Sequence, residues 1–273
     1  MLPITFYGEI MLKELKLYPK YVSMSLRSGL SYKADSIIMM ISFAITEIVS
    51  LATVYLIVGT VPAIGFWTFP TLAFLFGFTL VPKAIDHIFT DELWMLAYWA
   101  IRRGELDIYM TRPLNPLFQF IAQTFKWDGI GELVVGIVIM CIFGPQAGIA
   151  WSAGGVIALI LCAVLGIFCF TGIKLLFASI AFWVKYAGIF LNTVYDLSNY
   201  AKYPVRYMGK AFASIMFFVI PFGLFLYYPV ECLVTGTNIW WSVLWSAIAA
   251  VILMALALAV WHIGIRRYES AGN

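Results

Sequence analysis

The sequence predicts an all-α integral membrane protein, and three observations carry the prediction. Hydrophobic residues make up 63% of the chain, charged residues make up 11%, and the mean hydropathy is +0.94. Soluble domains are roughly half apolar and a quarter charged. The apolar residues also form stretches close to the about 20 residues that a spanning helix needs. We therefore expect a single membrane domain over residues 1–273, with no added soluble catalytic module.

Seven apolar stretches are candidate spans. In chain order they are Ile37–Val58, Phe66–Ile85, Gly129–Phe143, Ile149–Ile173, Leu175–Tyr195, Ala211–Val230 and Ile239–Ile263. Lysine and arginine lie in the N-terminal region, in the polar segment 86–128 and at the C-terminus, whereas the turns Gly59–Gly65 and Gly144–Gly148 carry no charge. Because cytoplasmic loops are enriched in positive charge, we expect both turns outside and both termini inside. The number of crossings is then even, so one stretch does not cross and about six spans remain.

The first 36 residues are mixed rather than apolar. Lys13, Lys16, Lys20 and Arg27 alternate with leucine, tyrosine and methionine. This pattern suits an amphipathic helix on the cytoplasmic face, with its basic residues toward anionic lipid headgroups. The alternative is an ordinary solvated segment that leads into the first span.

The segment 203–233 is the first candidate for the stretch that does not cross. It is apolar, but three prolines interrupt it: Pro204, Pro221 and Pro229. A proline inside a helix costs roughly 3 kcal/mol. We therefore expect a re-entrant pair of half-helices, which must be buried in protein or line a cavity. In the competing topology Leu175–Tyr195 fails to cross. Charge alone favours that competitor, because Lys202, Arg206 and Lys210 would otherwise lie outside.

Motifs for catalysis or metal binding do not occur. The chain has no Walker A sequence, no HExxH and no GxSxG. We therefore expect no catalytic residue, no metal site and no cofactor in this chain. Gly129, Gly131 and Gly136 do not have the dinucleotide-binding spacing, and they indicate close helix packing instead.

A few ionisable residues fall inside or beside the spans. Glu47 lies near the middle of the first span, where a charge costs at least about 2.5–3.5 kcal/mol. It is a candidate buried polar site, either for a proton or substrate cation or for a hydrogen bond between helices. We expect Glu132 in a cap or salt bridge, His87 as an interfacial side chain, and Lys174 beside a short inside turn.

The polar segment contains a short amphipathic element. Its sequence, IRRGELDIYMTRPL over Ile101–Leu114, carries charges of both signs that no span requires. Three apolar residues, Leu106, Tyr109 and Met110, are suited to anchor it. Interface hot spots commonly combine aromatic or arginine anchors with a polar rim. We expect this element to hold a soluble partner on the cytoplasmic side.

The run GELDIYMTRPLNPLFQ strongly resembles the cytoplasmic loop of ATP-binding-cassette permeases of the type-2 exporter class. The branch in question has Gly-Glu-Leu-Asp, then two or three residues, then Leu-x-Arg-Pro-Leu-Asn-Pro. This chain departs from it at Met110, where leucine is more frequent. The likeness extends to YKADSIIMM at the first span and to the dipeptides Tyr203-Pro204, Ile220-Pro221 and Tyr228-Pro229.

The resemblance implies an architecture and a set of partners. It implies six spans, an N-terminal elbow helix within residues 1–36, and dimerisation with a second permease copy or a paralogue. Two separate ATPase subunits would carry ATP and Mg, with no nucleic acid involved. The coupling residues would be Arg102, Arg103, Gly104, Glu105, Leu106, Asp107, Tyr109, Arg112, Pro113 and Leu114. The outer gate would be the re-entrant segment 203–233, with Tyr203, Pro204, Pro221 and Pro229.

The function that follows from the resemblance is ATP-driven export. The chain would move an amphipathic or hydrophobic solute out of the cytoplasm or the inner leaflet of a bacterial cytoplasmic membrane. Two alternatives stay open. One is a proton-coupled secondary transporter with Glu47 as the carrier, and the other is a membrane-embedded enzyme or assembly factor.

Overall fold

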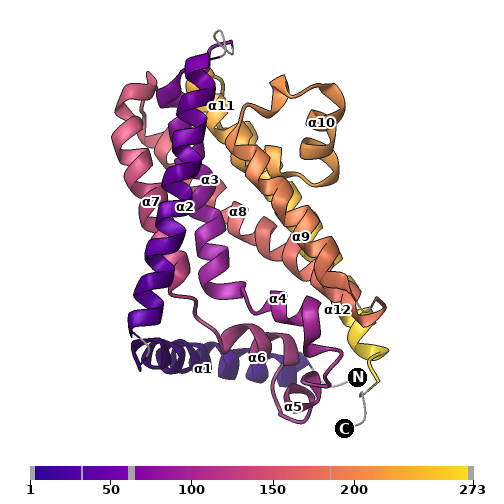
Figure 1. Cartoon of the computed structure of the whole chain (residues 1–273). Helices are drawn as coiled ribbons and strands as arrows, with labels where there is room; N and C mark the ends of the chain where they lie inside the picture. The colour runs from indigo at the N-terminus through magenta and orange to yellow at the C-terminus, as the bar shows by residue number, and fades with distance from the viewer. Residues whose placement is uncertain (1–3, 32, 61–64, 185, 270–273) are drawn as a thin grey trace.

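The regular structure of the chain is helical throughout the part that the structure describes (Figure 1). The computed structural model describes residues 4–31, 33–60, 65–184 and 186–269. Within them four helices are long and apolar enough to cross a membrane. They lie in α2 (Lys33–Thr60), α3 (Phe69–Thr90), α8 (Ala153–Ser179) with the turn η3 (Ile180–Phe182), and α12 (Trp240–Arg266). The prediction of an all-α membrane protein is confirmed.

Two shorter helices accompany these spans. Helix α7 (Asp128–Phe143) has 16 residues and α9 (Ala187–Leu197) has 11, so both are shorter than the about 20 residues of a straight span. The 3-10 turns η4 (Ser198–Lys202) and η5 (Val205–Tyr207) continue the chain after α9. The turn η2 (Pro145–Ala147) joins α7 to α8 at the expected external turn Gly144–Gly148. The other expected external turn, Gly59–Gly65, includes residues 61–64, which lie outside the described residues.

Helix α3 is the centre of the bundle because it packs against α2, α7 and α8. Its apolar side chains, such as Leu75 and Leu80, are fully buried. A Cβ added to Gly77 would lie 2.8 Å from the carbonyl oxygen of Gly136 in α7. Small residues let membrane helices approach closely, so the prediction that Gly136 serves helix packing is confirmed. Gly131 allows the same close approach between α7 and α2, because a Cβ at this position would lie 2.4 Å from the carbonyl oxygen of Met40.

Some expected boundaries were wrong. The expected span Leu175–Tyr195 is not one helix, because α8 continues to Ser179 and α9 begins only at Ala187. The polar segment was expected to begin at residue 86, but Asp86 lies inside α3 and is fully buried. The break after α8 was hidden in the sequence because its residues are as apolar as those of a span.

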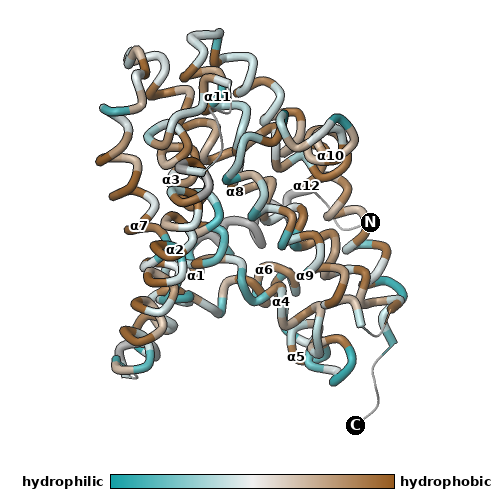
Figure 2. The backbone as a smooth tube through the Cα atoms, turned by 45° about the horizontal axis from the view of Figure 1, so that its top comes forward, coloured by the Kyte–Doolittle hydropathy of each residue, from teal (hydrophilic) through white to brown (hydrophobic). Residues whose placement is uncertain are grey.

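A layer of helices lies across one end of the spans, the end that is expected to be cytoplasmic. It consists of α1 (Ile4–Ser31), α4 (Leu93–Met95), the π-helix η1 (Leu96–Ala100), α5 (Leu106–Met110) and α6 (Pro116–Ala122). Figure 1 shows α1 lying across the lower end of α2. Figure 2 shows hydrophobic residues dominating the long helices and hydrophilic residues frequent around α4 and α5. Residues 1–3 and 32 of the expected elbow segment lie outside the described residues.

The segment 203–233 is folded into short helices rather than one span. It contains η5, α10 (Lys210–Ser214), the π-helices η6 (Ile215–Val219) and η7 (Gly223–Tyr227), and most of α11 (Tyr228–Thr235). The two helical stretches Lys210–Val219 and Gly223–Thr235 meet at a bend of 90°. They would form a fifth candidate span only if the two stretches were counted together as one broken span. The bend lies at Ile220 and Pro221, because proline cannot continue the helical hydrogen bonds.

Candidate functional site

The coupling segment, which we define as Ile101–Leu114, is a turn followed by the single-turn helix α5. Gly104 has a φ of 71°, a backbone conformation that glycine adopts without steric cost. This left-handed residue reverses the chain between η1 and α5. Arg102, Arg103 and Arg112 are exposed, so the segment presents positive charge at the protein surface.

The apolar residues of the coupling segment divide into buried and exposed ones. Leu106 is fully buried in a cluster with Leu93, Leu96 and Ala100. It therefore fixes α5 to the rest of the protein, and the expectation that it anchors a partner was wrong. Ile108 is 55% exposed and Met110 is 46% exposed. The sequence analysis included Met110 but missed Ile108. The available signal was its spacing, because a residue two positions after a buried one lies on a different face of a helix.

Helix α6 packs against α5 and forms hydrogen bonds with it. The Tyr109 hydroxyl donates a hydrogen bond to Gln123 Oε1 at 2.8 Å, and its ring meets Phe120 edge-on. Burial raises the pKa of Tyr109, so the phenol remains a donor at neutral pH. The buried amide of Gln119 donates to the carbonyl oxygens of Tyr109 and Leu114. These bonds fix the C-terminal half of the coupling segment.

The C-terminal residues also reach α5. Tyr268 packs partly buried against the cluster that contains Leu106. Burial, with a further contribution from Asp107, raises the pKa of Tyr268 to about 12. Asp107 therefore interacts with the protein's own C-terminus.

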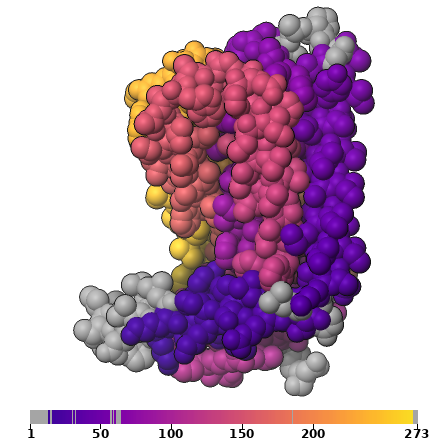
Figure 3. Space-filling view, turned by 90° about the vertical axis from the view of Figure 1, so that its left-hand side faces the viewer, coloured from indigo at the N-terminus to yellow at the C-terminus, as the bar shows by residue number. Residues whose placement is uncertain are grey.

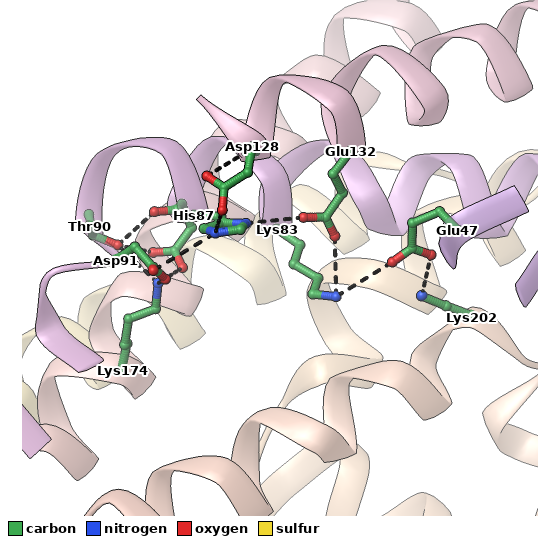
Figure 4. Close-up of polar contacts among 11 residues, drawn as sticks. Glu47, Lys83, His87, Thr90, Asp91, Asp128, Glu132, Lys174 and Lys202 are labelled. Atoms are coloured by element: carbon green, nitrogen blue, oxygen red, sulfur yellow. Dashed lines mark hydrogen bonds and ion pairs between the residues drawn. The ribbon is translucent and has the colours of Figure 1, made fainter. Parts of the chain in front are cut away.

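A second set of polar residues forms a chain of ion pairs between the long helices (Figure 4). Lys202 Nζ donates to Glu47 Oε2 at 2.8 Å, and Lys83 Nζ lies 3.9 Å from Glu47 Oε1. Lys83 also lies 3.2 Å from Glu132. One arm of the chain thus joins η4 to α2, α3 and α7.

The chain continues through His87 toward α8. The His87 ring lies 3.5 Å from Glu132, 3.6 Å from Asp128 and 3.8 Å from Asp91. Lys174 in α8 then lies 3.5 Å from Asp91 and 2.7 Å from Asp86. The nine residues Glu47, Lys83, Asp86, His87, Asp91, Asp128, Glu132, Lys174 and Lys202 are called the ion-pair chain below.

Helix α3 supplies the middle of this chain by its periodicity. Lys83 and His87 are four residues apart and lie on one face, where they meet Asp128 and Glu132, which have the same spacing on α7. Asp86 lies on the neighbouring face, and it accepts hydrogen bonds from Thr90 at 2.6 Å and Thr171 at 2.8 Å. The matched spacing on two neighbouring spans was a signal that sequence reasoning missed.

The outcomes for the other ionisable residues follow from this geometry. The expected salt bridge of Glu132 is confirmed. The expectation that Lys174 lies beside an inside turn was wrong, because the residue lies inside α8 and its side chain is fully buried. Glu47 is 6% exposed and pairs with two lysines, which matches the expected bond between helices.

A cavity of about 430 Å³ opens beside the ion-pair chain. Its polar wall contains Lys83, His87, Asp91, Glu132 and Asn192. The remaining wall is apolar and mostly aromatic, with Phe43, Trp94, Met95, Tyr98, Trp99 and Tyr195. Pockets of this kind, apolar with a few converging polar groups, are typical of small-molecule sites.

The segment 203–233 is held by its own polar contacts. Arg206 Nε donates to Glu231 Oε2 at 2.8 Å, and the Tyr227 hydroxyl donates to Glu231 Oε1 at 2.9 Å. Tyr203, which has an extended backbone conformation, and Pro204 connect η4 to η5. Pro229 lies in the first turn of α11, where proline is tolerated. Only Pro221 lies at the sharp bend. Among the described residues, no group of three or more histidine, cysteine or acidic side chains is placed to hold a metal ion.

Comparison with known proteins gives one finding. Residues 40–272 match the family model described as ABC-2 family transporter protein. This match covers the spans, the coupling segment and the segment 203–233. No curated protein and no solved structure gives a match.

Proposed function

The chain belongs to the ABC-2 transporter family, and from this premise we propose that it is the membrane-spanning permease subunit of an ATP-driven exporter. The observation that carries the proposal is the coupling segment. It presents exposed arginines and two exposed apolar side chains, Ile108 and Met110, on a rigidly held single-turn helix. A separate ATPase that binds ATP and Mg is the partner for this surface, and a second permease copy or paralogue completes the transporter.

The attachment of the coupling segment to the spans supports this role. Leu106 packs in one apolar cluster with Leu175 of α8 and Ala257 and Trp261 of α12. A displacement of α5 by the ATPase therefore moves the cytoplasmic ends of two spans. ATP binding that brings two coupling segments together would rock these spans and open a path between the permease copies.

The segment 203–233 is proposed to be the outer gate. Lys202, which precedes it, meets Glu47 midway along α2. Further on, Tyr207 contacts Gly65 in the expected external turn. The chain from α9 to η5 thus rises from the cytoplasmic side to the outer side in a broken crossing. With α10 to α11 re-entrant, this gives six crossings with both termini in the cytoplasm.

The cavity beside the ion-pair chain supports an amphipathic solute. Its aromatic wall suits apolar surface, and its charged wall suits a polar group. The proton-coupled alternative is weaker, because Glu47 is held by Lys202 and Lys83 rather than facing a proton path.

The coupling proposal is tested by placing charge on the apolar anchors. In the double variant Ile108→Asp, Met110→Asp, co-purification of the ATPase should fall at least tenfold, because truncating or repelling a hot-spot anchor costs about 2 kcal/mol or more. Thr111→Asp is the matched control, since it adds a charge to the same exposed helix end without removing an anchor. Wild-type ATPase binding and transport in a well-folded double variant would show that this segment does not couple.

A further inference from the structure

Four basic side chains of α1 lie on one narrow face of the helix. At about 100° per residue, Lys13, Lys16, Lys20 and Arg27 fall within an arc of about 60°. All four are exposed, and no ion pair joins them to another described residue. Met24 lies at the edge of the same arc and is 69% exposed. We call these four cations the basic stripe.

The opposite face of α1 is bound to the chain that follows the coupling segment. Glu14 accepts a hydrogen bond from the backbone N–H of Asn115 at 2.7 Å, and Ser25 accepts one from Phe125 at 2.9 Å. Tyr18 and Tyr21 pack on Phe118. The Trp127 indole lies against Gly29. These contacts centre about 150° away from the basic stripe around the helix.

The location of the basic stripe selects its partner. Figure 3 shows α1 on the outside of the protein, at the level where α2 begins. Helix α6 contacts both α1 and α5, and the basic stripe points away from the contacts of α1 with the chain around α6. The stripe therefore faces the perimeter at the height of the inner-leaflet headgroups.

We propose that the basic stripe binds the headgroups of anionic phospholipids in the cytoplasmic leaflet. Charge complementarity carries the assignment, since four cations with no acidic partner among the described residues face a surface that is negative in most cytoplasmic leaflets. The exposed Met24 adds an apolar side chain that enters the headgroup boundary. Because the opposite face of α1 holds Asn115 and Phe125, the bound lipid steadies the chain beside the coupling segment.

The test measures lipid selectivity at the stripe in the full chain. Cys141 is the exposed cysteine and the other three are buried, so a Cys141→Ser background accepts a single fluorophore at Met24→Cys. The chain is placed in nanodiscs of phosphatidylcholine with increasing fractions of brominated phosphatidylglycerol or brominated phosphatidylcholine. Quenching of the fluorophore gives the relative affinity of the two lipids for the stripe.

The expected result is preferential quenching by brominated phosphatidylglycerol. Lys16→Gln with Lys20→Gln should lower this preference by about fivefold for each cation removed. Lys16→Arg with Lys20→Arg should keep it. Arg266→Gln with Arg267→Gln removes the same charge from exposed positions at the end of α12 and should also keep it.

Three outcomes would overturn the proposal. The first is equal quenching by the two brominated lipids. The second is a loss of lipid preference in the Arg266→Gln, Arg267→Gln control as large as in the Lys16→Gln, Lys20→Gln variant. The third is shielding of the fluorophore from both lipids when the ATPase is bound, which would assign the stripe to a protein partner. The measurement needs neither transport nor ATPase activity. Its failure is therefore distinguishable from failure of the export proposal.

Discussion

The ion-pair chain and the coupling segment both combine acidic and basic residues, but in opposite surroundings. In the ion-pair chain, Lys174 and Asp86 are 2.7 Å apart and both side chains are 0% exposed. In the coupling segment, Arg103 and Glu105 are 4.0 Å apart with side chains 67% and 42% exposed. The first pair joins α8 to α3, whereas the second joins neighbours in one turn.

Burial decides what each set of charges does. A charge removed from water must be paired and hydrogen-bonded to be tolerated, so each buried pair fixes the relative position of two helices. An exposed pair contributes little because water and salt screen it. Its charges stay available to a partner. Buried charges in this protein therefore hold the helices together, whereas the arginines of the coupling segment lie exposed at the surface.

The largest effect is expected at Asp86. Asp86→Ala leaves Lys174 buried with only the more distant Asp91, and breaking a buried pair in this way costs about 3–5 kcal/mol. The free energy of unfolding, measured by titration with a denaturing detergent, should fall by that amount or the protein should fail to accumulate. The double variant Asp86→Leu, Lys174→Met removes both charges and should recover most of the loss. A fully stable Asp86→Ala protein would contradict the comparison.

A smaller effect is expected at Glu47. Glu47→Gln removes the acid facing Lys202, while Lys83 keeps Glu132 as a partner. The free energy of unfolding should fall by about 1–3 kcal/mol, the cost of a buried group left unsatisfied. Adding Lys202→Gln should restore stability and leave transport active. Loss of all transport in the stable double variant would instead favour Glu47 as a proton or cation site.

The smallest effect is expected for the exposed pair. A double-mutant cycle with Arg103→Ala and Glu105→Ala should give a coupling energy below about 1 kcal/mol in the same unfolding assay. If the coupling equals that of the Asp86 and Lys174 pair, burial is not what separates the two regions.

Composition and local pattern predicted several parts of the site. The charged run from Arg102 to Arg112 between apolar stretches identified the coupling segment. The spacing of Pro204, Pro221 and Pro229 predicted short helices in the segment 203–233. Proline disrupts a helix by local geometry, so its effect can be read without knowing the neighbours.

The ion-pair chain could not be assembled in the same way. Its members are spread from Glu47 to Lys202, and their pairing depends on which spans are neighbours. Lys174 illustrates this. A lysine in an apolar stretch is compatible with a turn between two spans, and only the packed structure shows that Asp86 faces it as a buried partner. Leu106 illustrates the converse, since an apolar residue in an exposed loop can belong to the protein's own core.

The sequence by itself determined that this protein is an all-α membrane protein with a charged element between its spans and a segment interrupted by prolines. Those features follow from hydropathy, charge distribution and proline geometry, which act over a few neighbouring residues. Tertiary structure alone decided which charges are buried and paired, which side chains of α5 face outward, and where α1 presents its basic stripe. These depend on contacts between residues as distant as Glu47 and Lys202, and only the packed bundle brings such residues together.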